Sequence, residues 1–150
     1  MGTQVIILSG ISGSGKSTYA RHTYPGAVVC SADKFPGLYV NGEIQFAKLS
    51  DAHNACLRNF TVALLEGAPV IVVDNTNTTA TEIAPYAAMA LAFGATLEIL
   101  TIECDADTAH GRNLHNVPRG GVEAQAERLA TRDLPPWWPV RAVKATRKAA

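Results

Sequence analysis

The feature that most constrains this chain is the octapeptide GISGSGKS at residues 10–17, which matches the pattern G-x-x-x-x-G-K-[ST]. A chance match is expected in roughly one of a few hundred chains of this length. An apolar run from Val5 to Leu8 stands directly before the octapeptide, and the segment from Ser17 to His22 reads as the start of a helix. A loop between a strand and a helix is the setting that a phosphate-binding loop requires.

The residue types of this loop suit the binding of an anion. Glycines let backbone N–H groups turn inward, and a helix that begins there adds the positive end of its dipole. We expect Lys16 to reach the β and γ phosphates of ATP or another nucleoside triphosphate, and the Ser17 hydroxyl to bind Mg²⁺. The residues expected to hold the nucleotide are Gly10, Ser12, Gly13, Ser14, Gly15, Lys16, Ser17 and Thr18. The alternative is a glycine-rich turn with a solvated lysine.

Apolar, strand-like runs alternate with helical stretches along the chain, which predicts an α/β fold with a mostly parallel sheet of four or five strands. The expected strands are 5–8, 27–31, 69–73 and 95–102, and the expected helices after the first are 46–66, 79–93, 105–115 and 122–132. Residues 35–43 read as a loop. No repeat or low-complexity linker divides the chain, so we expect one domain over residues 1–150.

Composition narrows the setting in which the chain works. The three cysteines are widely spaced, without a C-x-x-C pair, which argues for free thiols in a reducing compartment. Residues 1–9 contain no basic segment, and no stretch approaches the roughly 18 apolar residues of a membrane span. We therefore expect a cytoplasmic protein with no membrane partner. The formal net charge is zero, but residues 109–150 hold eight Lys or Arg against three Asp or Glu.

Two aspartates follow predicted strands, where ligands bind in an open parallel sheet. Asp74 ends the run VIVVD, the position of the aspartate that holds Mg²⁺ in phosphate-loop proteins; the alternative is a solvated turn aspartate. No glutamate follows Asp74 to activate water, and the chain has no N-K-x-D segment for reading guanine. A phosphotransferase needs a base beside the acceptor hydroxyl, and Asp33 is the best candidate, the alternative being an Asx turn or a helix cap.

Four ordered segments resemble the polynucleotide 5′-hydroxyl kinases of the phage type and their P-loop relatives, over residues 4–132. The segments are GISGSGKST, Ser31-Ala32-Asp33, Asp74-Asn75-Thr76-Asn77, and Arg112-Asn113 followed by Val117-Pro118. The resemblance implies a three-layer α/β/α kinase-like fold. It also implies phosphate and metal contacts by Lys16 and Ser17, proton removal from the 5′-hydroxyl by Asp33, and a lid at about 112–121 that carries Arg112 onto the phosphates.

The chain departs from this family at the acceptor side. Pro36 stands where the phage-type enzymes have an arginine, and Lys34 is the nearest cation. Arg119 is the candidate for a second lid arginine. Lys34, His53 and Asn77 are the candidate acceptor contacts. His53 shares the helical spacing of the apolar stripe at 46, 49, 57, 60 and 64, so we expect it to point inward, either as a core histidine or toward the acceptor or Asp33.

The C-terminal segment at about 134–150 reads as a Pro- and Trp-rich basic tail, and residues 134–139, with three prolines around Trp137-Trp138, cannot form a regular helix. Its aromatic and basic side chains either stack on and neutralise a single strand, or pack on the domain surface and remain solvated. Together these patterns predict a Mg²⁺-dependent kinase that uses ATP, and they favour a nucleic acid 5′ end as its acceptor. A small-molecule or nucleoside kinase and a non-catalytic nucleotide-binding module remain alternatives, and the oligomeric state stays open.

Overall fold

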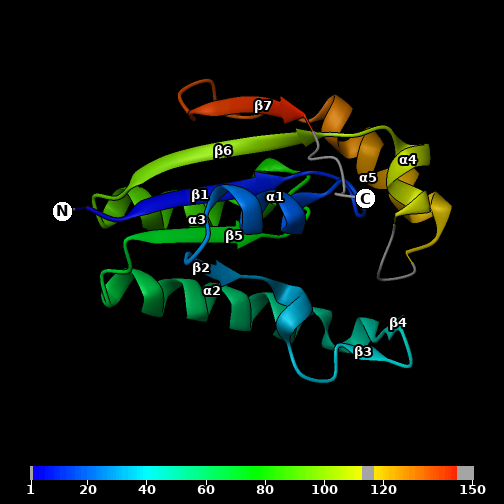
Figure 1. The fold of residues 1–150 in the computed structure, drawn as a ribbon, viewed down its shortest axis with the longest axis horizontal. Helices are drawn as coiled ribbons and strands as arrows, with labels where there is room; N and C mark the ends of the chain where they lie inside the picture. The colour runs from blue at the N-terminus through cyan, green and yellow to red at the C-terminus, as the bar shows by residue number, and fades with distance from the viewer. Residues whose placement is uncertain (1, 113–116, 145–150) are drawn as a thin grey trace.

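A computed structural model describes residues 2–112 and 117–144. Its central sheet has the strand order β2-β5-β1-β6-β7, with every neighbouring pair parallel (Figure 1). The strands are β1 (Gln4–Ser9), β2 (Val28–Cys30), β5 (Val70–Asp74), β6 (Thr96–Glu103) and β7 (Val140–Lys144). The expectation of an α/β fold with a mostly parallel sheet is confirmed.

The helices lie between the strands along the chain. They are α1 (Lys16–Thr23), α2 (Leu49–Leu65), α3 (Ala80–Ala92), α4 (Ala106–Gly111) and α5 (Arg119–Thr131), with short 3₁₀ turns η1 (Ala32–Lys34) and η2 (Phe46–Lys48). A second, two-stranded sheet consists of β3 (Tyr39–Val40) and β4 (Glu43–Ile44).

The sheet is covered on both faces, which explains the continuous apolar runs Val5–Leu8 in β1 and Val70–Val73 in β5. On one face, Val5 and Ile7 of β1 pack in a core with buried residues of α2 and α3. On the other face, Ile6 and Leu8 pack with Ala20 of α1. The three-layer arrangement that the resemblance implied is thus present.

The carboxyl ends of the strands point toward one end of the molecule, where α4, α5 and the β3–β4 hairpin also lie (Figure 1). Local hydrogen bonds fix where the nearby helices begin. Thr79 accepts from the N–H of Glu82 at the start of α3, and the Glu82 carboxylate accepts in turn from the N–H of Thr78. Asp105 caps α4 by accepting from the N–H of Thr108 at 2.8 Å. This end of the sheet is therefore rigidly built.

Several sequence expectations need correction. The segment 35–43 is not only loop: it contains β3, and the Asn41-Gly42 turn leads into β4 with φ of 52° and 79°, which is the twist that favours tight hairpins. The 46–66 helix begins as a 3₁₀ turn, and Phe46 is 75% exposed instead of buried, because that turn stands before the helix. The helix predicted at 105–115 is α4, which ends at Gly111, and residues 113–115 lie outside the described residues. The helix predicted at 122–132 is α5, which begins earlier, at Arg119.

Sequence patterns indicated no strand in the C-terminal segment, but the structure has one at residues 140–144. They form β7, which pairs with β6 in parallel from Ile99↔Val140 onward, and Arg141 forms an ion pair with Glu98. Trp138 is half-buried against the core, whereas Trp137 is 75% exposed. Arg147 and Lys148 lie outside the described residues. Within 2–112 and 117–144, no helix has the length and apolar character to cross a membrane.

Candidate active site

The predicted phosphate loop connects β1 to α1 at the carboxyl edge of the sheet. Gly13 and Gly15 have φ of 83° and 98°, a region that side chains disfavour. A Cβ at Gly13 would lie 1.9 Å from the carbonyl oxygen of Ala109 on α4. Glycine at position 13 is therefore required twice, by its backbone conformation and by the close approach of α4.

Lys16 folds back over the loop that contains it. Only 8% of the residue is exposed, and its Nζ donates to the carbonyl oxygens of Gly10 and Ile11 at 3.0 and 2.9 Å. Burial lowers the pKa of Lys16 from its ordinary value, and the negative charges of Asp74 and Asp33 oppose that shift. The ammonium group thus lies inside the loop, and the Asp74 and Asp33 carboxylates are near enough for their negative charges to favour its protonated form.

Ser17 and Asp74 meet although they lie 57 positions apart in the sequence. The Ser17 hydroxyl donates to Oδ2 of Asp74 at 2.6 Å. The contact follows from the sheet order, because β5 pairs with β1 and Asp74 lies beside Leu8 in the register. A hydroxyl and a carboxylate are hard oxygen donors, the chemistry that Mg²⁺ prefers when it also binds phosphates. The two residues therefore fit the predicted metal role.

Asp33 lies on the same edge of the sheet. It follows β2, whose Cys30 pairs with Val73 of β5, and its exposed carboxylate accepts from the hydroxyl of Tyr39 at 2.6 Å. Burial raises the pKa of Tyr39, and the hydrogen bond to Asp33 raises it further, so this hydroxyl stays a donor at neutral pH. The capping oxygen of η1 belongs to Ser31, which accepts from the N–H of Asp33. The carboxylate of Asp33 is thus not the N-cap of this turn.

The three candidate acceptor contacts differ in their surroundings. Lys34 donates from Nζ to the carbonyl of Val29 at 2.8 Å. His53 is exposed, so the inward orientation expected from its spacing is wrong: the buried positions of α2 include Ala52 and Cys56, and position 53 is turned away from them. Contacts of Lys34 or His53 with an acceptor stay predictions.

Asn77 is buried in the turn that follows β5. Its side-chain amide donates to the backbone carbonyl of Leu8 at 2.8 Å, and its backbone carbonyl accepts from the Ser9 hydroxyl at 2.8 Å. Its φ is 44°, a conformation that asparagine tolerates better than most residues. These contacts tie the end of β5 to β1, and an acceptor contact by Asn77 stays a prediction.

The two lid arginines lie on either side of residues outside the described range. Arg112 is half-buried at the end of α4, and its positive charge opposes the burial that raises the pKa of the Cys104 thiol. Arg119 opens α5, is exposed, and pairs with Asp107 of α4. Residue 113 and the middle of the predicted lid lie outside the described residues. The catalytic roles of both arginines stay predictions.

Sequence reasoning missed three side chains, two from α5 and one directly after it, that contact the phosphate loop and the carboxyl edge of the sheet. Gln125 accepts from the N–H of Ser12 at 2.7 Å, and Arg128 donates to the hydroxyl of Thr78 at 3.0 Å. Arg132 donates to the Ser9 hydroxyl at 2.6 Å, to the Asn77 carbonyl at 3.1 Å and to the Thr101 hydroxyl at 2.9 Å. Gln125 and Arg128 are three residues apart, which places them on one face of α5 and was the available signal, whereas Arg132 is the extended residue that follows the helix.

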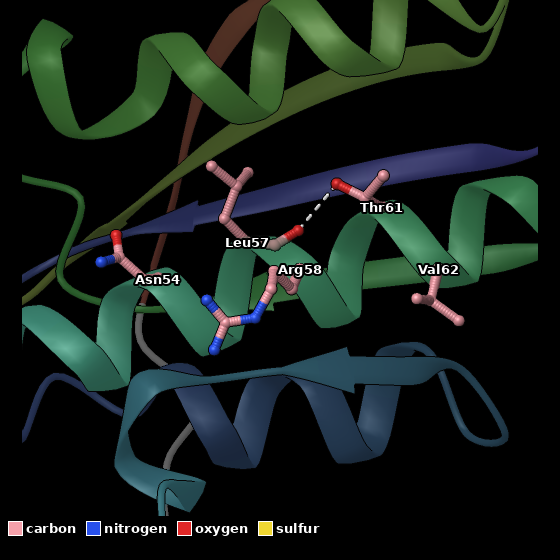
Figure 2. A pocket seen from close by; sticks show the side chains of 5 residues that line it. All are labelled: Asn54, Leu57, Arg58, Thr61 and Val62. Carbon is pink, nitrogen blue, oxygen red and sulfur yellow. Dashed lines mark hydrogen bonds between the residues drawn. The ribbon is translucent and has the colours of Figure 1, made fainter.

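A shallow hollow lies elsewhere, on the surface of α2. Figure 2 shows its lining side chains, all from that one helix, with the Thr61 hydroxyl bonded to the Leu57 carbonyl at 2.9 Å. The lining residues are Asn54, Leu57, Arg58, Thr61 and Val62. None of them is a predicted site residue, so the hollow does not mark the candidate active site.

A phosphate loop between the first strand and first helix of a parallel sheet, with an aspartate at the end of the neighbouring strand, defines a kinase-like P-loop domain. The chain belongs to the AAA domain family, which matches residues 5–134.

The similar proteins agree with this class. Human NEDD4-binding protein 2 is 35% identical over 94 residues, which is 59% of this chain but 5% of that protein's length. A gluconokinase from Sinorhizobium meliloti 1021 aligns with a TM-score of 0.64 at 19% identity, covering 97% of this chain and 84% of that one. A chain in the Pnkp1/Rnl/Hen1 RNA repair complex aligns with a TM-score of 0.70 at 16% identity, covering 86% and 44%. At such identities the structural matches show a shared fold.

Proposed function

We propose that this domain is a Mg²⁺-dependent kinase that transfers the γ-phosphate of ATP to a hydroxyl group, and that the acceptor is the 5′-hydroxyl end of a nucleic acid. The observation that carries the proposal is the position of Asp33. Its exposed carboxylate follows β2 at the carboxyl edge of the sheet, where Lys16, Ser17 and Asp74 also lie. The negative charge of Asp33 favours the protonated form of Lys16. A site that only bound nucleotide would have no need of a second carboxylate open to solvent.

The part of the site that would bind ATP consists of groups that are hydrogen-bonded to one another in this structure. In the proposed complex Lys16 holds the β and γ phosphates, and loop N–H groups and the start of α1 hold their negative charge. Ser17 and Asp74 hold Mg²⁺, which neutralises charge on the phosphate oxygens. Arg112 and Arg119 are proposed to neutralise the charge that develops on the transferred group, because a planar guanidinium matches phosphate oxygens.

At the acceptor half, Asp33 acts as general base. Its carboxylate takes the proton of the acceptor hydroxyl as the acceptor oxygen forms a bond to the γ-phosphorus and the bond between that phosphorus and the bridging β–γ oxygen breaks. The products are ADP and the phosphorylated acceptor. Tyr39 donates to the same carboxylate and holds it in place.

Two observations favour a nucleic acid end over a small molecule. Asp33 is exposed, and its neighbours Lys34 and the β3–β4 hairpin are at the surface, so the base is reachable by the end of a polymer. A structural neighbour takes its name from an RNA repair complex, which is consistent with an acceptor of this kind.

With three cysteines that are free thiols, we place the protein in the reducing cytoplasm.

The test is a transfer assay with γ-labelled ATP and a panel of acceptors. The panel contains 5′-hydroxyl DNA, 5′-hydroxyl RNA, the same oligonucleotides already bearing a 5′-phosphate, nucleosides, and gluconate as a small polyol acid. We expect label on the 5′-hydroxyl oligonucleotides and none on their 5′-phosphorylated counterparts. Label only on nucleosides or gluconate would replace the polynucleotide acceptor by a small molecule. Nucleotide binding without label on any acceptor would favour the non-catalytic binding module.

A further inference from the structure

Helix α5 touches the phosphate loop at one backbone group. The side-chain Oε1 of Gln125 accepts from the N–H of Ser12 at 2.7 Å, in a partly buried contact between residues 113 positions apart. A glutamine side chain loses considerable rotamer freedom when it is held in one position. This contact therefore fixes the loop relative to α5 at a specific atom.

The peptide unit that Gln125 holds is also the one that Lys16 contacts. The N–H of Ser12 and the carbonyl of Ile11 belong to the same peptide, and the Ile11 carbonyl accepts from Nζ of Lys16 at 2.9 Å. In a trans peptide these two groups point in opposite directions. The Ile11–Ser12 peptide thus lies between Gln125 on one side and the Lys16 ammonium on the other.

The orientation of this peptide is set by ψ of Ile11 and φ of Ser12, the two soft backbone dihedrals on either side of it. Rotation of the peptide would turn the Ser12 N–H toward the ammonium of Lys16, where a donor facing a cation is unfavourable. Two contacts oppose that rotation: Gln125 accepts from the Ser12 N–H, and the N–H of Ser14 donates to the Ile11 carbonyl at 3.1 Å. Gln125 is the contact that comes from outside the loop, and it stabilises the orientation that presents a carbonyl to Lys16.

We propose that Gln125 is a positioning residue of the donor site, which acts through the Ile11–Ser12 peptide on the ammonium of Lys16. The inference rests on the proposed function and extends it, because it makes the helix that follows the lid a part of the phosphate-binding apparatus. Arg132 supports this role by anchoring the end of α5 to Ser9 and Thr101.

The experiment measures ATP and AMP affinities of the full chain by competition against a fluorescent nucleotide in Mg²⁺ buffer, together with melting temperatures. Gln125→Met keeps the length of the side chain but lacks the acceptor. Glu127→Met, at an exposed position of the same helix, is the matched control. Lys16 serves the β and γ phosphates, which AMP lacks, so an effect through Lys16 must distinguish the two nucleotides.

We expect Gln125→Met to weaken ATP binding about tenfold, equivalent to about 1.4 kcal/mol, with AMP affinity and melting temperature close to wild type. Glu127→Met should bind both nucleotides normally. Equal weakening of ATP and AMP, or a lowered melting temperature, would show a packing role and overturn the inference, and so would unchanged ATP affinity. Wild-type protein that binds no ATP would instead refute the proposed function.

Discussion

At the residue scale, the proposed ATP site is a set of polar groups that form hydrogen bonds with one another. Lys16 donates to two loop carbonyls, Ser17 donates to Asp74, and Gln125 accepts from Ser12. Each of these bonds satisfies a group that burial would otherwise leave unpaired at considerable cost. An ammonium has three N–H donors, so Lys16 can keep its bonds to the two loop carbonyls and direct the third N–H to a phosphate oxygen in the proposed complex. Ser17 would exchange its bond to Asp74 for a contact with Mg²⁺.

Removing the Lys16 ammonium should therefore strongly weaken nucleotide binding. We expect Lys16→Ala to weaken ATP binding by about 10- to 10²-fold, because a charge-assisted contact to phosphates that contributes roughly 1.5–3 kcal/mol is lost. The measurement is a nucleotide titration, with His22→Ala on the exposed side of α1 as the control. Phosphate transfer at the normal rate by Lys16→Ala would contradict the donor assignment.

Gly13 makes a prediction about stability. Alanine there suffers the left-handed conformation, about 1–2 kcal/mol, and also a clash with the Ala109 carbonyl. Gly26 is a matched control, since its φ is 84° and nothing lies within 4 Å of a Cβ built on it. Chemical denaturation should show a larger loss of unfolding free energy for Gly13→Ala than for Gly26→Ala. Equal losses would mean that α4 yields to the methyl group without cost.

How far the sequence predicts a residue depends on how local its partners are. The loop motif and the strand that ends at Asp74 are local patterns, and a parallel sheet suffices to bring them together. Gln125 and Arg132 make their contacts to residues 113 and 123 positions away, which no local pattern encodes. His53 was misplaced because apolar spacing on α2 leaves the borders of its buried face undefined.

At the element scale, the strands around the site differ in how clearly the local sequence predicts them. The strands β1, β5 and β6 contain runs of buried apolar residues, and they were predicted within one or two residues of their bounds. β7 was missed because an edge strand needs apolar residues on only part of its surface, and lysine and arginine are common at sheet edges. The segment VRAVK therefore reads as a basic tail until its neighbour β6 is known.

The lid is the element with the most direct prediction for catalysis. If Arg112 neutralises charge that develops during transfer, Arg112→Ala should lower kcat by about 10² or more while leaving ATP affinity nearly unchanged. Steady-state kinetics together with a direct ATP titration separates the two quantities. Arg58→Ala, an exposed arginine on α2, is the control for loss of a positive charge. A fall in ATP affinity without a fall in kcat would make Arg112 a ground-state contact.

At the scale of the whole molecule, the strand order explains why the residues with different proposed roles lie next to one another at one edge of the sheet. β5 lies between β1 and β2, so Asp74 stands between the phosphate loop that follows β1 and Asp33 that follows β2. Donor, metal and base positions thus form a row along one edge of the sheet. α4 and α5 lie at the same end (Figure 1), and α5 is bonded to the loop and to the ends of β1 and β6.

The measurement that tests the central claim most directly compares Asp33→Asn with Asp74→Asn in single-turnover transfer from ATP and in Mg²⁺-dependent ATP titrations. Asp33→Asn keeps the shape of the side chain but cannot take a proton, so we expect a rate lowered by about 10² to 10⁴ with normal ATP affinity and melting temperature. Asp74→Asn should lose both rate and Mg²⁺-dependent affinity, because its charge faces the metal. Transfer by Asp33→Asn at close to the wild-type rate, or a loss of ATP affinity equal to that of Asp74→Asn, would contradict the assignment of Asp33 as the base.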